Sequence, residues 1–149
     1  MFLDQILSVI NSARLRTAIY WRAIALLPWS KARCATVQSI VFLVAKGFAL
    51  GKIRRSDLWI GTDGLSDALL KRGWSKTTAL NDLKPGMILF SQDLKGRKGA
   101  PDHTYTFHHW DSRTGNVAWI YDNNSPGLTR RNLGPGRSTP FEYALYPPV

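Results

Sequence analysis

The hydrophobic periodicity of this chain changes near residue 73, and this change constrains the fold more than any other feature. Before that point, apolar residues recur at three- and four-residue steps, as they do on one face of a helix. After it, short apolar runs lie between turn residues, which is typical of strands. Helices followed by antiparallel strands make the α+β pattern. We therefore predict an α+β fold in which N-terminal helices pack on an antiparallel sheet.

The helical part divides into stretches that end at proline or glycine. We expect helices over residues 2–27, from Cys34 to Gly47 or Gly51, and over residues 63–72. Asn11-Ser12 is a candidate break that would divide the first stretch into two shorter helices. Asp63 is the expected N-cap of the last helix.

The second half predicts short strands separated by turns. The expected strands are residues 87–90, 103–110, 117–122 and 141–146. Residues 111–116 form the turn of a hairpin, and residues 125–140 are expected to be a loop because they hold three glycines and three prolines.

Length and composition exclude several classes of protein. A chain of 149 residues with 44% hydrophobic residues is expected to form one domain with its own core. A single cysteine excludes a disulfide framework and a cysteine-based zinc site, and we expect no metal and no cofactor. The longest apolar runs are far too short for a transmembrane segment. No signal peptide pattern is visible, so we expect synthesis in the cytoplasm.

The positive charge is concentrated in the first third of the chain. The net charge is +10; residues 1–56 hold nine basic residues and one acidic residue, whereas residues 57–149 hold eleven and nine. Such a basic segment attracts nucleic acid, anionic lipid or an acidic cell-wall polymer, and the alternative is simply a solvated face. No nucleic-acid-binding motif accompanies the charge, so we do not expect nucleic acid as the partner.

Cys34 and His103 are the candidate nucleophile and base. Cys34 falls at the predicted start of a helix, where the helix dipole and free N–H groups favour a thiolate. The alternative is a buried structural cysteine, since free cysteines are commonly buried. His103 opens a predicted strand, where its side chain could face a packed helix end. A nucleophile, a base and a group that orients the base are what thiol catalysis needs.

The orienting group is expected at the end of the partner strand. In a hairpin, the start of the first strand lies beside the end of the second, so His103 and Asp122 should be neighbours. We favour Asp122 as the orienting residue with Asn124 in support. Asn123 stays open, because strands often bulge near active sites.

These residues also carry a resemblance to a known family. The order is Cys34 at a helix start, Leu83-Lys84-Pro85-Gly86 before an apolar strand, His103 opening the next strand, and Tyr121-Asp122-Asn123-Asn124. This order resembles the NlpC/P60 and CHAP groups of papain-like cysteine peptidases, over roughly residues 30–125. The resemblance implies a papain-like core over residues 29–149, preceded by a basic helical segment over residues 1–28.

The resemblance implies a function as well. It suggests a cysteine hydrolase that cleaves an amide bond in bacterial peptidoglycan, as an endopeptidase or an amidase, with Cys34 as nucleophile and His103 as base. Such an enzyme would reach the cell wall after delivery or lysis, with phage-tail or secretion-apparatus proteins as candidate partners. Met87 stands where the family usually has aspartate. The alternative is therefore a catalytically degenerate structural or binding component of a phage tail or similar particle.

Other side chains are weaker candidates. Trp29 and Trp74 could contact a sugar or peptide substrate, although tryptophans more often pack in a core. His108 and His109 are adjacent in a predicted strand, where neighbouring side chains face opposite ways. We therefore expect them not to serve one site together, with one exposed and the other packed near the sheet.

Overall fold

The fold was obtained as a computed structural model that describes residues 2–29, 33–94, 100–135 and 140–148. The α-helices are α1 (Phe2–Asn11), α2 (Ala13–Leu26), α3 (Cys34–Ala45) and α4 (Thr62–Lys71). The strands are β1 (Ser75–Thr77), β2 (Ile88–Ser91), β3 (Thr104–Ser112), β4 (Val117–Tyr121), β5 (Thr129–Asn132) and β6 (Phe141–Tyr146). Three short 3-10 helices are η1 (Leu50–Lys52), η2 (Arg55–Asp57) and η3 (Leu80–Asp82). The predicted α+β class is confirmed.

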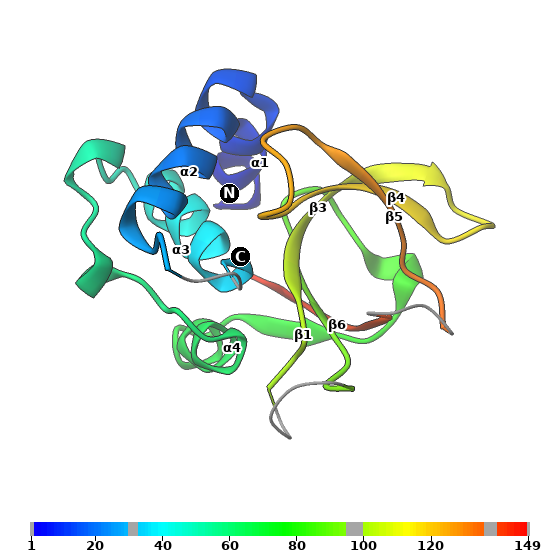
Figure 1. Cartoon of the computed structure of the whole chain (residues 1–149). Helices are drawn as coiled ribbons and strands as arrows, with labels where there is room; N and C mark the ends of the chain where they lie inside the picture. The colour runs from blue at the N-terminus through cyan, green and yellow to red at the C-terminus, as the bar shows by residue number, and fades with distance from the viewer. Residues whose placement is uncertain (1, 30–32, 95–99, 136–139, 149) are drawn as a thin grey trace.

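The strands form one antiparallel sheet in the order β1-β6-β2-β3-β4-β5. Figure 1 shows the sheet strongly curved, with α1, α2 and α3 grouped on one side of it. Alternate residues of β2 point to two different cores. Ile88 and Phe90 pack with the helices, whereas Leu89 packs on the other face with Tyr105 and Ala144. The sheet is therefore buried on both faces at its centre.

Helix α3 is the centre of the helical layer. Every residue from Cys34 to Leu43 is buried, because α1, α2, α4 and β3 all pack against this helix. A helix that is apolar on all sides is stable only in such a position. Three polar residues, Thr36, Gln38 and Ser39, are nevertheless buried within it, and the side chains of Gln38 and Ser39 are hydrogen-bonded. Their hydrogen-bond partners therefore matter to the architecture.

The expected break in the first helical stretch is present. Ser12 is the N-cap of α2, and its hydroxyl accepts a hydrogen bond from the backbone N–H of Leu15 at 3.1 Å. The helix that starts at Cys34 ends before Gly47, whose φ is +103°. Among the described residues, no helix is long and apolar enough to cross a membrane.

Two local predictions are wrong. The N-cap of α4 is Gly61 and not Asp63, which lies in the first turn of the helix. Residues 125–140 are not all loop, because Thr129–Asn132 pairs with β4 as an edge strand, while residues 136–139 lie outside the described residues. This strand has the sequence Thr-Arg-Arg-Asn, which lacks the apolar alternation that predicts strands. The three-residue β1 is equally polar and was not expected.

Gly86 and Gly47 allow a matched test of how the turn before β2 meets α1. Both have positive φ, but a Cβ at Gly86 would lie 2.8 Å from the backbone oxygen of Leu3, whereas a Cβ at Gly47 meets nothing. Gly47→Ala should cost about 1–2 kcal/mol of unfolding free energy from backbone strain alone. Gly86→Ala should cost clearly more, because the backbone of α1 must also move. Urea denaturation of both variants measures this, and equal losses would contradict the close approach.

Candidate active site

Cys34 is the first residue of α3 and is 7% exposed. The residue before it, Arg33, does not cap the helix with its side chain. The Arg33 guanidinium instead donates to the carbonyl oxygens of Leu27 and Pro28, at 2.8 and 3.1 Å. These bonds tie the start of α3 to the end of α2. The first backbone N–H groups of α3 are left without intrahelical partners, as at any helix start.

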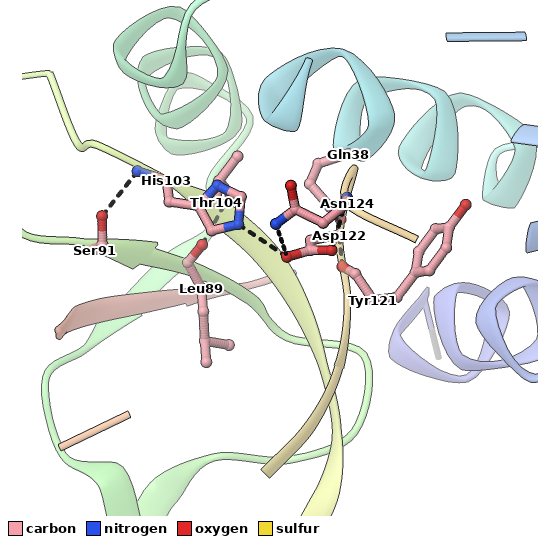
Figure 2. Close-up of polar contacts among 8 residues, drawn as sticks. All are labelled: Gln38, Leu89, Ser91, His103, Thr104, Tyr121, Asp122 and Asn124. Carbon is pink, nitrogen blue, oxygen red and sulfur yellow. Dashed lines mark hydrogen bonds and ion pairs between the residues drawn. The ribbon is translucent and has the colours of Figure 1, made fainter. Parts of the chain in front are cut away.

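His103 is held by the strand next to it. Its backbone N–H donates to the Ser91 hydroxyl at 2.8 Å, and its carbonyl accepts from the Ser91 N–H at 3.0 Å. The following residue, Thr104, donates its hydroxyl to the carbonyl of Leu89 at 2.8 Å. His103 therefore precedes β3 on a backbone fixed by β2, as Figure 2 shows.

The structure brings His103, Asp122 and Asn124 together. His103 Nε2 lies 3.0 Å from Asp122 Oδ2, and the Asn124 side-chain amide donates to the same oxygen at 3.0 Å (Figure 2). The backbone N–H of Asn124 donates to Asp122 Oδ1 at 2.9 Å. Asp122 thus contacts the imidazole directly, and Asn124 holds the carboxylate. The buried side-chain oxygen of Asn123 has no hydrogen-bond partner among the described residues.

The thiol of Cys34 lies near enough to His103 to influence the pKa of its imidazole. Because Nε2 of the imidazole faces Asp122, Nδ1 is the nitrogen left for the thiol. Burial lowers the pKa of His103, but hydrogen bonds to Asp122 and Cys34, together with their charges, outweigh burial and raise this pKa above its usual 6.5. The environment therefore stabilises the charged form of the imidazole beside the Asp122 carboxylate.

The pKa of Asp122 is displaced in the opposite direction. Burial raises it, but the hydrogen bonds from His103 and from the backbone N–H of Asn124 outweigh burial and hold it below its usual 3.8. The positive charges of His103 and Arg131 act in the same sense. Asp122 is only 1% exposed, so its charge is compensated inside the protein rather than by water.

Gln38 connects α3, which begins with Cys34, to strands β3 and β4, which lie next to His103 and Asp122. It lies one turn after Cys34 on α3, and its amide nitrogen donates to the carbonyl of Tyr121 at 3.0 Å. Its amide oxygen accepts from the Thr106 hydroxyl. Thr106 on β3 and Tyr121 on β4 are direct partners in the sheet. Sequence reasoning missed Gln38, although a lone amide four residues after Cys34 in an apolar helix was a visible signal.

Trp74 and Trp29 occupy different environments. Trp74 is 6% exposed and packs in the helical core beside Phe2 and Phe42, with ring centroids 6.2 and 6.1 Å away. Its position is that of a core residue. Trp29 is 64% exposed, and the Arg55 guanidinium lies over its ring at 4.6 Å. Of the two, only Trp29 presents a ring to solvent.

His108 and His109 do not follow the expected alternation. The pairing of β3 with β4 shifts between Phe107 and His109, which marks a bulge. The two Nδ1 atoms consequently lie 2.6 Å apart, and His108 Nε2 lies 2.5 Å from Asn11 Oδ1. The prediction that these side chains face opposite ways is therefore wrong, but the expected difference in exposure is present. His109 is exposed, whereas His108 is half-buried against Asn11. Within the described residues, no group of three or more His, Cys, Asp or Glu side chains could hold a metal ion.

The chain was also compared with family models, with curated proteins and with solved structures, and none of the three comparisons found a match.

Gln38 is expected to set the position of Cys34 relative to His103. In Gln38→Leu, the Tyr121 carbonyl and the Thr106 hydroxyl lose their buried partner, which should cost about 1–3 kcal/mol of stability. Misplacement of the thiol should also slow alkylation of Cys34 by iodoacetamide roughly tenfold or more at neutral pH. Alkylation is followed by mass spectrometry, under conditions where the variant is folded.

Ser39→Ala is the matched control. Ser39 is the next residue of α3, is equally buried, and bonds to Ala35 and Trp59 rather than to the hairpin. We expect it to lose comparable stability without slowing alkylation. If both variants slow alkylation in proportion to their lost stability, Gln38 merely stabilises the fold.

The pKa directions predict opposite pH dependences for two histidines. The raised pKa of His103 means that its contribution to stability is complete below pH 6.5 and is lost as pH rises through the folded-state value. Burial and the charges of His109 and Arg16 lower the pKa of His108, so its contribution is lost as pH falls. The stability lost in His103→Gln should therefore shrink between pH 5.5 and 8.5, and that lost in His108→Gln should grow. Urea denaturation at both pH values tests this, and slopes of the same sign would contradict it.

Proposed function

We propose that this protein is a cysteine hydrolase that cleaves an amide bond in bacterial peptidoglycan. The observation that carries the proposal is the contact between His103 and Asp122, with the thiol of Cys34 near enough to the imidazole to influence its pKa. A thiol, an imidazole and a buried carboxylate in that order are the groups that thiol catalysis requires. A papain-like fold, with its cysteine at a helix start packed on an antiparallel sheet, is part of the same proposal.

In the first half of the reaction, His103 takes the proton of the Cys34 thiol. The sulfur attacks the carbonyl carbon of the amide, and a tetrahedral intermediate forms. When the C–N bond breaks, protonated His103 gives its proton to the leaving amine, and a thioester remains on Cys34. Asp122 keeps the imidazole oriented and stabilises its charged form.

In the second half, His103 removes a proton from water, which attacks the thioester. The carbon–sulfur bond breaks, a carboxylic acid leaves, and the proton returns to the sulfur. In this mechanism the backbone N–H of Cys34, which is the first residue of α3, donates to the oxyanion in both halves. The Arg33 side chain does not cap this helix start, so it does not compete with the oxyanion for the backbone N–H.

The substrate class is supported by charge and by resemblance. The basic first third of the chain favours an anionic polymer over a neutral one. The residues around Cys34, His103 and Asp122 are similar to those of the NlpC/P60 and CHAP groups, which act on peptidoglycan. The proposal includes action at the cell wall after delivery or lysis, with phage-tail or secretion-apparatus proteins as partners.

One observation favours a second candidate function. Cys34 is 7% exposed, so a polymer has little direct access to its sulfur. A structural or binding component of a phage tail or similar particle would keep the fold and the buried network without turnover. Reactivity of the thiol separates the two candidates.

The test is the release of new amine groups from purified peptidoglycan. The unaltered protein should release them, whereas Cys34→Ala and His103→Ala should not. Asp122→Asn should lower the rate about 10²–10⁴-fold, because the imidazole loses its orienting partner. Mass analysis of the fragments identifies the bond that is cut.

His108→Ala and His109→Ala are the matched controls, since both residues are histidines of β3 outside the network. They should retain the activity of the unaltered protein. An unaltered protein that releases no amine, and whose Cys34 does not react with iodoacetamide at neutral pH, would reject the hydrolase in favour of the binding component.

A further inference from the structure

A cavity of about 680 Å³ lies apart from the cysteine network. It is open to solvent and is lined by the start of α1, by β1, by the η3 region and by the end of β6. The lining residues that matter here are Lys76, Asn81, Leu83, Lys84, Met87 and Arg113. Its volume falls in the range of sites that hold small molecules.

The cavity and the cysteine network lie at opposite ends of the same strands. Met87 lines the cavity just before β2 begins, whereas Ser91 at the other end of β2 bonds to His103. With about 3.3 Å per residue, these two positions are roughly 13 Å apart. On β6, Phe141 pairs with Ser91, and Tyr146 at the far end lines the cavity. The cavity is therefore separate from the site of the proposed hydrolysis.

The walls of the cavity combine an apolar floor with a cationic rim. Leu83 and Met87 are buried at its floor, with exposed fractions of 5% and 3%. Lys76, Lys84 and Arg113 supply three positive charges to the lining. Lys76 lies over the Tyr143 ring at 4.3 Å, and within the described part of the chain neither Lys84 nor Arg113 is paired with a carboxylate.

The lining has one acidic side chain, Asp82, and its Oδ2 accepts a hydrogen bond from the Thr77 hydroxyl at 3.3 Å. The lining therefore carries an excess of positive charge over an apolar floor. Charged donors next to apolar surface match a ligand that has both an acidic group and an apolar part.

We propose that this cavity binds a small amphipathic anion, with an acidic group held by Lys84 and Arg113 and an apolar or ring portion on Leu83 and Met87. This binding does not depend on the proposed hydrolysis, because the cavity shares no residue with the cysteine network. The failure of either proposal leaves the other in place.

The test uses 8-anilinonaphthalene-1-sulfonate, a fluorescent aromatic anion, as the probe. The unaltered full-length protein should bind it saturably at one site. Lys84→Ala with Arg113→Ala should weaken binding about tenfold or more, because two charged donors are lost. Asn81→Trp should weaken it as well, because the indole occupies the mouth of the cavity while the charge is unchanged.

Two controls separate this site from general attraction. Lys52→Ala with Arg54→Ala removes the same charge at exposed positions that do not line the cavity, and should change the affinity less than twofold. N-phenyl-1-naphthylamine, which has similar rings but no sulfonate, should bind at least tenfold more weakly. Equal weakening in both double variants, non-saturating binding, or equal affinity for the two dyes would overturn the proposal.

Discussion

The buried amide of Gln38 is the interaction on which the arrangement of the candidate site depends. An amide inside an apolar helix is tolerated only when both of its ends are hydrogen-bonded. Gln38 meets this condition with one group from β3 and one from β4, at residues that are paired with each other. The helix that begins with Cys34 is therefore matched to the hairpin that carries His103 and Asp122, and any sliding of one against the other would leave polar groups unpaired.

The site built on this connection is a linear network rather than a cluster. His103 contacts Asp122, Asn124 donates to Asp122, and the thiol of Cys34 lies near the imidazole. These residues come from α3, from the start of β3 and from the end of β4. The pKa values of His103 and Asp122 are displaced in opposite directions, which is the electrostatic signature of an ion pair formed inside the protein. Such displaced values are common where proton transfer occurs.

The sequence allowed the helix boundaries and the neighbourhood of His103 and Asp122 to be predicted, because both follow from strong local rules. The helix ends follow from the capping preference of Ser12 and the backbone preferences of Gly47 and Gly73. The contact between His103 and Asp122 follows from the hairpin, which brings the start of its first strand next to the end of its second. What could not be predicted depends on distant partners. β5 forms because the exposed edge of β4 offers backbone groups to pair with, and its own side chains carry no strand pattern. The contact between His108 and His109 requires a bulge, which alternation cannot anticipate.

Helices α1 and α2 are part of the same hydrophobic core as the rest of the fold. Ile6, Ile10 and Ile19 are fully buried in the same core as α3, and the Tyr121 hydroxyl donates to the carbonyl of Arg16 at 2.7 Å. Tyr121 immediately precedes Asp122, so the first two helices and the candidate site share one packed frame. An anionic polymer bound by the arginines of α2, as in the proposed function, would meet the cysteine network in one fixed orientation.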